Sequence, residues 1–109
     1  MKGYVGNISF RLLKRFVTEA DVEAVMGAYN RTNGEPCCAH KYLMEDVLRG
    51  KWKFEGHYTS DCWAIRDFHE HHMVTSTPRQ SAAMALNAGC DLNCGNTYLH
   101  MMGAIRMDW

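Results

Sequence analysis

The sequence predicts an α/β fold of consecutive strand–helix units that form part of a larger architecture. Segments typical of short strands alternate with segments typical of amphipathic helices, in the order helix, strand, helix, strand, helix, strand, helix. The second strand ends on a carboxylate, Asp61, at the edge where open α/β sheets and β/α barrels carry their functional groups. With 109 residues the chain makes at most one small domain, whereas a closed eight-stranded barrel needs about 250.

The first part of the chain supplies a helix, a strand and a turn. Residues 11–20 place apolar side chains on one face, which predicts the end of a helix. The run 24–29 is almost continuously apolar, which is typical of a parallel strand buried on both faces. Residues 30–36 hold an Asn-Gly pair and a proline, and these predict a turn.

A second helix and a second strand follow. Residues 39–48 carry apolar pairs at i,i+4 spacing, and Gly50 indicates where the helix ends. An aromatic link leads from there into the strand that ends at Asp61. We expect Arg49 and Trp52 to be structural and to tie the helix end to this strand.

The last part of the chain repeats the pattern after a polar, histidine-rich loop. Thr77 as N-cap and Pro78 at the first helical position predict a helix that runs to about residue 88. A very short strand, 90–92, follows, and a final helix starts at about Thr97.

Composition narrows the classes of function. Hydrophobic residues make up 47% of the chain and charged residues 22%, as in ordinary globular proteins. The formal net charge is +0, so we expect neither a nucleic-acid surface nor an anionic-membrane surface, because both need a basic excess. No apolar run reaches the length of a membrane span and no signal-like core follows the first residues, which leaves the compartment unassigned.

The cysteines and histidines do not have the spacing of a metal site. The five cysteines are odd in number and do not form two CxxC pairs; they are Cys37, Cys38, Cys62, Cys90 and Cys94. The run from His69 to His72 lacks the HExxH arrangement, so we expect solvated loop histidines. We therefore expect no metal site, and the family resemblance described below implies no organic cofactor either.

Asp61 is the strongest catalytic candidate from its position alone, because a carboxylate at a strand end is rigidly placed. A strand-end aspartate also caps the turn that follows in many proteins, and that reading stays open. Asp91, at another strand end, either faces the same pocket or supports the tight segment 89–95.

Three separated motifs resemble glycoside hydrolase family 3, in the order and at the spacing of that family's catalytic barrel. They cover about residues 16–105 and are similar to the family's sixth-strand segment, nucleophile signature and eighth-strand segment. The matching residues are Val25–Pro36, then Leu43–Arg49 with Trp52, Phe54, Gly56 and Ser60-Asp61-Cys62, then Ala88–Gly95. The β-xylosidase-like and related β-glucosidase members are the most similar. The resemblance implies a partial (β/α)8 barrel of the TIM type, roughly strands six to eight with their helices.

The resemblance also implies a retaining β-glycosidase that removes terminal β-linked sugars from an oligosaccharide or aryl glycoside. Asp61 corresponds to the nucleophile, and a second carboxyl group about 5–5.5 Å away serves as acid and base. Tyr29 orients Asp61 or stabilises the charged transition state. Cys62 and Trp63 line the sugar subsite, and Cys62 forms a disulfide with Cys90 at the barrel mouth.

By the same resemblance, the parts that complete the reaction are absent from these 109 residues. The family's sugar-binding residues precede this segment, and its acid/base residue follows in another domain. Without a proton donor or substrate positioning, we expect negligible glycosidase activity from the chain alone.

Residues 1–13 depart from the family pattern. Members carry a Tyr-Leu-Phe-Pro-Ala-Phe-Lys-like stretch where this chain has Ile8–Lys14. One choice of codons for that stretch, read two bases later, encodes Leu-Phe-Pro-Ala-Phe-Lys. We therefore expect an out-of-frame N-terminus over 1–13 and a barrel fragment over 14–109.

The alternative is a stand-alone α/β fragment without catalysis that acts as a binding or assembly module. Open strand edges and an exposed apolar sheet favour self-association. A monodisperse monomer with a cooperative melt would support the module, whereas aggregation or a dimer that completes a half-barrel would support a truncated enzyme.

Overall fold

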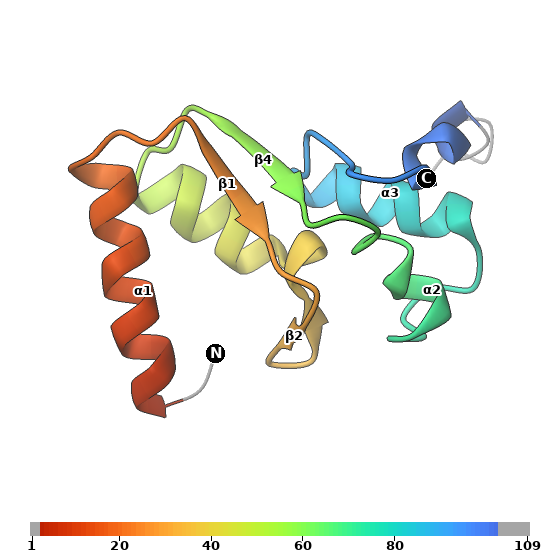
Figure 1. Cartoon of the computed structure of the whole chain (residues 1–109), viewed down its shortest axis with the longest axis horizontal. Helices are drawn as coiled ribbons and strands as arrows, with labels where there is room; N and C mark the ends of the chain where they lie inside the picture. The colour runs from red at the N-terminus through yellow and green to blue at the C-terminus, as the bar shows by residue number, and fades with distance from the viewer. Residues whose placement is uncertain (1–2, 103–109) are drawn as a thin grey trace.

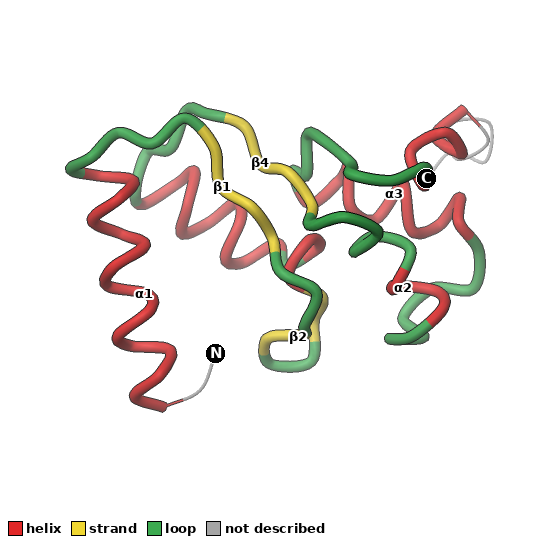
Figure 2. The backbone as a smooth tube through the Cα atoms, in the orientation of Figure 1, coloured by secondary structure: helices red, strands yellow, loops and turns green. Residues whose placement is uncertain are grey.

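The computed structural model describes residues 3–102 (Figure 1). Residues 1–2 and 103–109 lie outside the described part, and with them the outer ends of the expected segments 1–13 and 14–109. Figure 2 shows helices and strands alternating along the chain. The elements are α1 (Gly3–Thr18), β1 (Ala24–Gly27), β2 (Arg31–Thr32), β3 (Glu35–Pro36), η1 (Cys37–Ala39), η2 (Tyr42–Lys51), β4 (His57–Ser60), α2 (Asp67–Glu70), α3 (Pro78–Ala88) and η3 (Thr97–His100).

Two parallel strands, β1 and β4, form the centre of the fold. Their register pairs Val25 with Tyr58 and Gly27 with Ser60. A single parallel bridge between Thr59 and Leu92 continues the pairing on the other edge of β4. The prediction of consecutive strand–helix units is confirmed: η2 lies between the parallel strands β1 and β4, and α3 lies between β4 and the bridge at Leu92. The third strand is shorter than the predicted 90–92.

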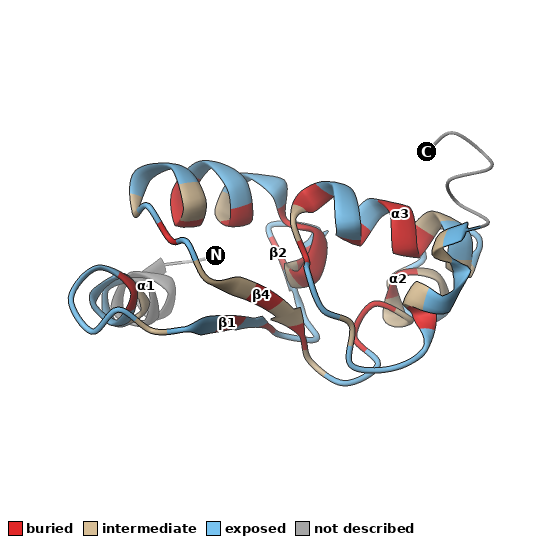
Figure 3. Ribbon diagram, turned by 90° about the horizontal axis from the view of Figure 1, so that it is seen from above, coloured by how far each residue is buried: buried red, intermediate tan, exposed pale blue. Residues whose placement is uncertain are grey.

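The sheet is covered on one face. Val25 and Tyr58 are buried there beneath the helices, whereas Met26, on the opposite face, is 61% exposed. Figure 3 shows η2 and α3 on the same side of β1 and β4. The prediction that residues 24–29 are buried on both faces was wrong, because no element within residues 3–102 covers the second face.

The core lies between the covered face of the sheet and the helices. Its largest fully buried side chains are Phe68, Met44 and Ile65. They come from the two connections that flank β4: Met44 from η2 before it, and Ile65 and Phe68 from the segment between β4 and α3. Packing from both connections therefore surrounds the end of β4, where Asp61 follows.

Arg49 ties the end of η2 to the sheet, as predicted. Its Nη1 donates to the carbonyl of Gly56 at 3.1 Å, and its Nη2 donates to Asp91 Oδ2 at 2.7 Å. The same carboxylate oxygen accepts the backbone N–H of Tyr58 at 2.8 Å. Asp91 was expected either to face the pocket of Asp61 or to have a structural role, and these bonds show the structural role.

The start of α3 agrees with the sequence. Thr77 Oγ1 accepts the N–H of Gln80 at 3.2 Å, and Pro78 occupies the first turn. Gly89 ends the helix with a φ of 107°, in the left-handed region that glycine adopts without strain.

Three elements differ from the predictions. The expected turn over residues 30–36 contains a short antiparallel hairpin, β2–β3. The expected loop of solvated histidines contains a helical turn, α2. The second helix runs over Tyr42–Lys51 rather than 39–48 and is a π-helix, in which Trp52 N–H reaches the carbonyl of Val47 at 2.9 Å. Among residues 3–102, no helix is long and apolar enough to cross a membrane.

Candidate active site

Asp61 follows β4 directly, and a hydrogen bond of its backbone N–H fixes its position. Its N–H donates to the carbonyl of Gly27 at 2.9 Å, which places it at the carboxyl end of the β1–β4 pair. Its carboxylate Oδ1 accepts the N–H of Cys62 at 2.8 Å. The side chain is partly buried. The carboxylate is thus held at the sheet edge that the sequence predicted.

Tyr29 lies beside Asp61, two residues beyond the end of β1. Its side chain is 48% exposed. Loss of solvent raises the pKa of the phenol, and the charge and hydrogen bonding of the Asp61 carboxylate raise it further. The carbonyl of Tyr29 is bonded to Nε2 of His72 at 2.9 Å, which connects this segment to the loop after β4. Tyr29 therefore interacts with Asp61, the residue that the resemblance to family 3 implied as its partner.

Cys62 forms a disulfide, but not with the residue expected. It is bonded to Cys94, with an S–S distance of 2.11 Å and 4.4 Å between the two Cα atoms. Cys90 is a fully buried free thiol that donates to the carbonyl of Leu92 at 3.4 Å. The predicted pairing of Cys62 with Cys90 was wrong because of strand register. With Leu92 opposite Thr59, Cys94 lies level with the end of β4, whereas Cys90 lies near its start.

Trp63 presents an aromatic ring at the same edge. Trp63 is 42% exposed, and the guanidinium carbon of Arg66 lies 4.8 Å from the centroid of its ring. The backbone of Trp63 has a φ of 67°, and its N–H bonds to the carbonyl of Cys94. A Cβ placed on Gly95 would come within 3.0 Å of the ring. The disulfide and Gly95 together allow the segment 92–95 to pack closely against Trp63.

Sequence reasoning missed a polar group on the loop after β4. Asp67 Oδ1 lies 2.6 Å from Nδ1 of His71, and the charge of Asp67 also contributes to the raised pKa of Tyr29. The i,i+4 spacing of Asp67 and His71 was a usable signal, but only once the loop was known to form a helical turn. Within residues 3–102, no three His, Cys, Asp or Glu side chains are arranged to hold a metal ion.

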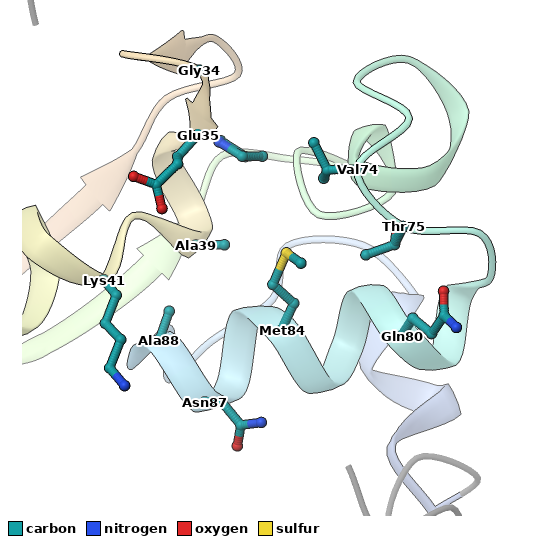
Figure 4. Close-up of a pocket in the computed structure, with 11 residues that line it drawn as sticks. Gly34, Glu35, Ala39, Lys41, Val74, Thr75, Gln80, Met84, Asn87 and Ala88 are labelled. Atoms are coloured by element: carbon teal, nitrogen blue, oxygen red, sulfur yellow. The ribbon is translucent and has the colours of Figure 1, made fainter.

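The hollow drawn in Figure 4 lies away from these residues. It measures about 470 Å³ and lies between β3, η1 and α3, with Ala39, Met84 and Ala88 among its apolar lining. Neither Asp61 nor Tyr29 lines it, and the same holds for Cys62 and Trp63. The candidate site is therefore separate from this hollow.

Known proteins show the same sequence pattern and the same fold. The sequence model of the glycosyl hydrolase family 3 N terminal domain matches residues 8–105. The chain is 46% identical over 93 residues to a probable exo-1,4-beta-xylosidase of Neosartorya fischeri, covering 83% of this chain and 12% of that protein.

Solved structures agree with this match. A novel beta-glucosidase from Erythrobacter marinus superposes with a TM-score of 0.83 at 33% identity, over 88% of this chain and 13% of that one. An exo-beta-xylosidase in complex with a xylobiose aziridine activity based probe superposes with a TM-score of 0.80 at 32% identity, over 83% of this chain and 12% of that one. The chain spans only about an eighth of these proteins, and it belongs to glycosyl hydrolase family 3, within the N-terminal domain.

Proposed function

We propose that this chain is the part of a family 3 catalytic barrel that supplies the nucleophile of a retaining β-glycosidase, Asp61. It corresponds to roughly strands six to eight of that barrel. The observation that carries the proposal is the position of Asp61, directly after β4 and bonded to the end of β1. In β/α barrels, the catalytic groups lie at this carboxyl edge.

The surroundings of Asp61 suit a nucleophile. A carboxylate that attacks an anomeric carbon must be ionised and must not move away from the sugar. The carboxylate accepts the Cys62 N–H, and the backbone bond to Gly27 fixes the position of the residue. The Tyr29 phenol, adjacent to the carboxylate, supplies a donor that orients it or stabilises the charge that develops in the transition state.

Cys62 and Trp63 are proposed to line the sugar subsite. The exposed ring of Trp63 offers a flat apolar surface of the kind that packs against a sugar ring. The disulfide to Cys94 and the backbone bond to the same residue hold Trp63 in its left-handed conformation. A rigid subsite wall beside the nucleophile lowers the entropic cost of bringing the anomeric carbon into line.

The uncovered face of the sheet supports the partial-barrel assignment. In a barrel, alternate strand residues point to the interior and pack against residues of the other strands. Ala24 and Met26 occupy the interior-facing positions of β1 and are exposed. The missing strands of a complete barrel would bury them, which explains an exposed methionine in the middle of a central strand.

The substrate class is a terminal β-linked sugar on an oligosaccharide or aryl glycoside. The relatives are described as exo-xylosidases and beta-glucosidases, which favours xylose or glucose. Hydrolysis by two carboxyl groups needs no metal and no organic cofactor. We propose no role for nucleic acid or membrane.

A chimera tests the proposal. Residues 16–105 of this chain replace the matching segment of the Neosartorya fischeri relative, and hydrolysis of an aryl β-xyloside is measured. We expect a folded chimera to hydrolyse the substrate, and its Asp61→Asn variant to lose activity by about a thousandfold or more. Asp46→Asn, an exposed aspartate on η2, is the matched control and is expected to retain activity. A folded Asp61→Asn chimera with undiminished activity would overturn the assignment.

The chain alone is proposed to be inactive. Asp61 has the position of a nucleophile, but the second carboxyl group of the two-carboxylate reaction comes from another part of the complete enzyme. The same aryl β-xyloside assay, run on the 109-residue chain, is expected to give the rate of the buffer blank. Turnover that disappears in Asp61→Asn would show that the chain carries its own acid.

A further inference from the structure

A polar hollow separate from the Asp61 edge lies between α2, the start of α3 and η3. It measures about 270 Å³, and its polar lining comes mainly from Arg66, His69, Glu70, Asn96 and His100. Figure 1 shows these segments gathered at one end of the molecule. Three of the five side chains are cationic or become so on protonation, and a fourth is an amide that can donate a hydrogen bond.

Among the described residues that line the hollow, the one acidic side chain, Glu70, is already paired. Glu70 Oε2 lies 3.0 Å from Nε of Arg66. The Arg66 side chain is 42% exposed, and its guanidinium stacks on Trp63, with the guanidinium carbon 4.8 Å from the ring centroid. Because Arg66 carries five N–H groups in a planar fork, one contact with Glu70 leaves terminal donors for a second partner.

His69 and His100 add hydrogen-bond donors to the hollow. Neither forms an ion pair with a carboxylate among the described residues that line it. His69 Nδ1 is bonded to Ser81 Oγ at 2.8 Å, which leaves Nε2 as the ring nitrogen for another contact. Burial lowers the pKa of His69, and repulsion from His100 and Arg66 lowers it further, against the opposing charges of Glu70 and Asp67. Two imidazoles and a guanidinium that repel one another across one hollow are stabilised together by a bound anion.

We propose that this hollow binds a small oxyanion, either inorganic phosphate or the carboxylate of an acidic sugar. Arg66 is the main ligand, and His69 and His100 contribute ring N–H donors. Guanidinium and protonated imidazole form charge-assisted hydrogen bonds with both kinds of oxyanion. In β/α barrels, a phosphate site is frequently formed by the loops after the seventh and eighth strands, and this hollow is lined by residues that follow β4 and the bridge at Leu92. The site requires no catalysis at Asp61, so its test is independent of the proposed glycosidase reaction.

The six histidines of the chain give a direct readout. Their ring signals are followed by NMR in the full chain, at a pH near the ordinary histidine pKa of about 6.5. Sodium phosphate, sodium glucuronate and neutral glucose are titrated separately at constant ionic strength. We expect saturable shifts at His69 and His100, assigned with His69→Gln and His100→Gln, and none at His40 or His57.

The outcomes separate the ligands. Shifts with phosphate alone assign a phosphate site, shifts with glucuronate alone assign an acidic-sugar site, and shifts with both assign a general oxyanion site. Linear, unsaturable shifts, or equal shifts with glucose, would overturn the proposal.

A variant pair tests the role of the guanidinium. Arg66→Gln is expected to weaken binding about tenfold, because a charge-assisted contact is lost. Arg31→Gln, which removes an exposed arginine of β2, is the matched control and is expected to leave the affinity unchanged. Unperturbed signals of His40 and His57 report that each variant is folded. Equal affinities of folded Arg66→Gln and Arg31→Gln would exclude Arg66 as a ligand.

Discussion

The backbone N–H of Asp61 donates to the carbonyl of Gly27 at 2.9 Å, and this bond closes the β1–β4 ladder at its carboxyl end. The proposed nucleophile is therefore placed by the last hydrogen bond of the central strand pair. Gly27 itself is buried. Any change that separates these two residues acts on both the stability of the sheet and the position of the carboxylate.

Gly27→Ala is expected to destabilise the fold by overpacking. A Cβ at this position would lie 2.6 Å from Tyr58 Oη and 2.7 Å from Cys38 Sγ, both in the core. Overpacking of this kind costs about 1–3 kcal/mol, measured as a lower midpoint of urea unfolding. Gly34→Ala is the comparison. An added Cβ at this position meets nothing within 4 Å, so the only cost is the strain of alanine at a φ of 88°. A smaller loss at Gly27 than at Gly34 would contradict the packing explanation.

Removal of the disulfide is expected to destabilise the chain chiefly through its unfolded state. Cys62 and Cys94 are 32 residues apart, and closing a loop of that length corresponds to about 3–4 kcal/mol in the chain-entropy model. Cys62→Ser with Cys94→Ser should lower the free energy of unfolding by that order, measured in urea. Dithiothreitol should destabilise the wild type and leave the double variant unchanged; an equal effect on both would show that the bond does not form in solution.

Asp61→Asn is expected to lower the pKa of the Tyr29 phenol. Burial and the Asp61 carboxylate both raise that pKa, because each disfavours the phenolate. The variant removes the negative charge and retains the burial, so the pKa should fall toward its ordinary value without reaching it. Ultraviolet titration of the chain, with Tyr29→Phe to identify the signal, measures the shift. An unchanged Tyr29 pKa would mean that the two groups do not interact in solution.

Two substitutions of Asp91 distinguish the contribution of its hydrogen bond from the contribution of its charge. Asp91→Ala leaves the N–H of Tyr58 without its acceptor, which costs about 1–3 kcal/mol for a buried donor. Asp91→Asn retains an acceptor oxygen for Tyr58 and loses only the charge opposite Arg49, so it should be the milder change. Urea unfolding of the two variants gives the order, and an equal loss in both would assign the effect to the ion pair instead.

The sequence was most informative where the signal is local. The cap at Thr77 and the end of the helix at about residue 88 depend on neighbouring residues only, and the structure confirms both. Asp61 was found because a short predicted strand ends abruptly on it. These features need no knowledge of which segments pack together.

What the sequence did not reveal depends on segments far apart in the chain. Cys94, not Cys90, meets Cys62 because Leu92 lies opposite Thr59, and only the register of two strands determines that. Met26 belongs to a run that suits a strand covered on both faces, yet within the described part of the chain one face is uncovered. The helical turn at α2 was hidden by a polar, histidine-rich composition that is equally typical of a loop.

The most direct test of the account is to locate the covalent adduct of a xylobiose aziridine probe on the chimera described above. The probe reacts with the nucleophile of a retaining glycosidase, so peptide mass spectrometry identifies the labelled carboxylate. The account predicts a single adduct on Asp61 and none in Asp61→Asn. An adduct on a different carboxylate, or equal labelling of the Asp61→Asn chimera, would contradict it.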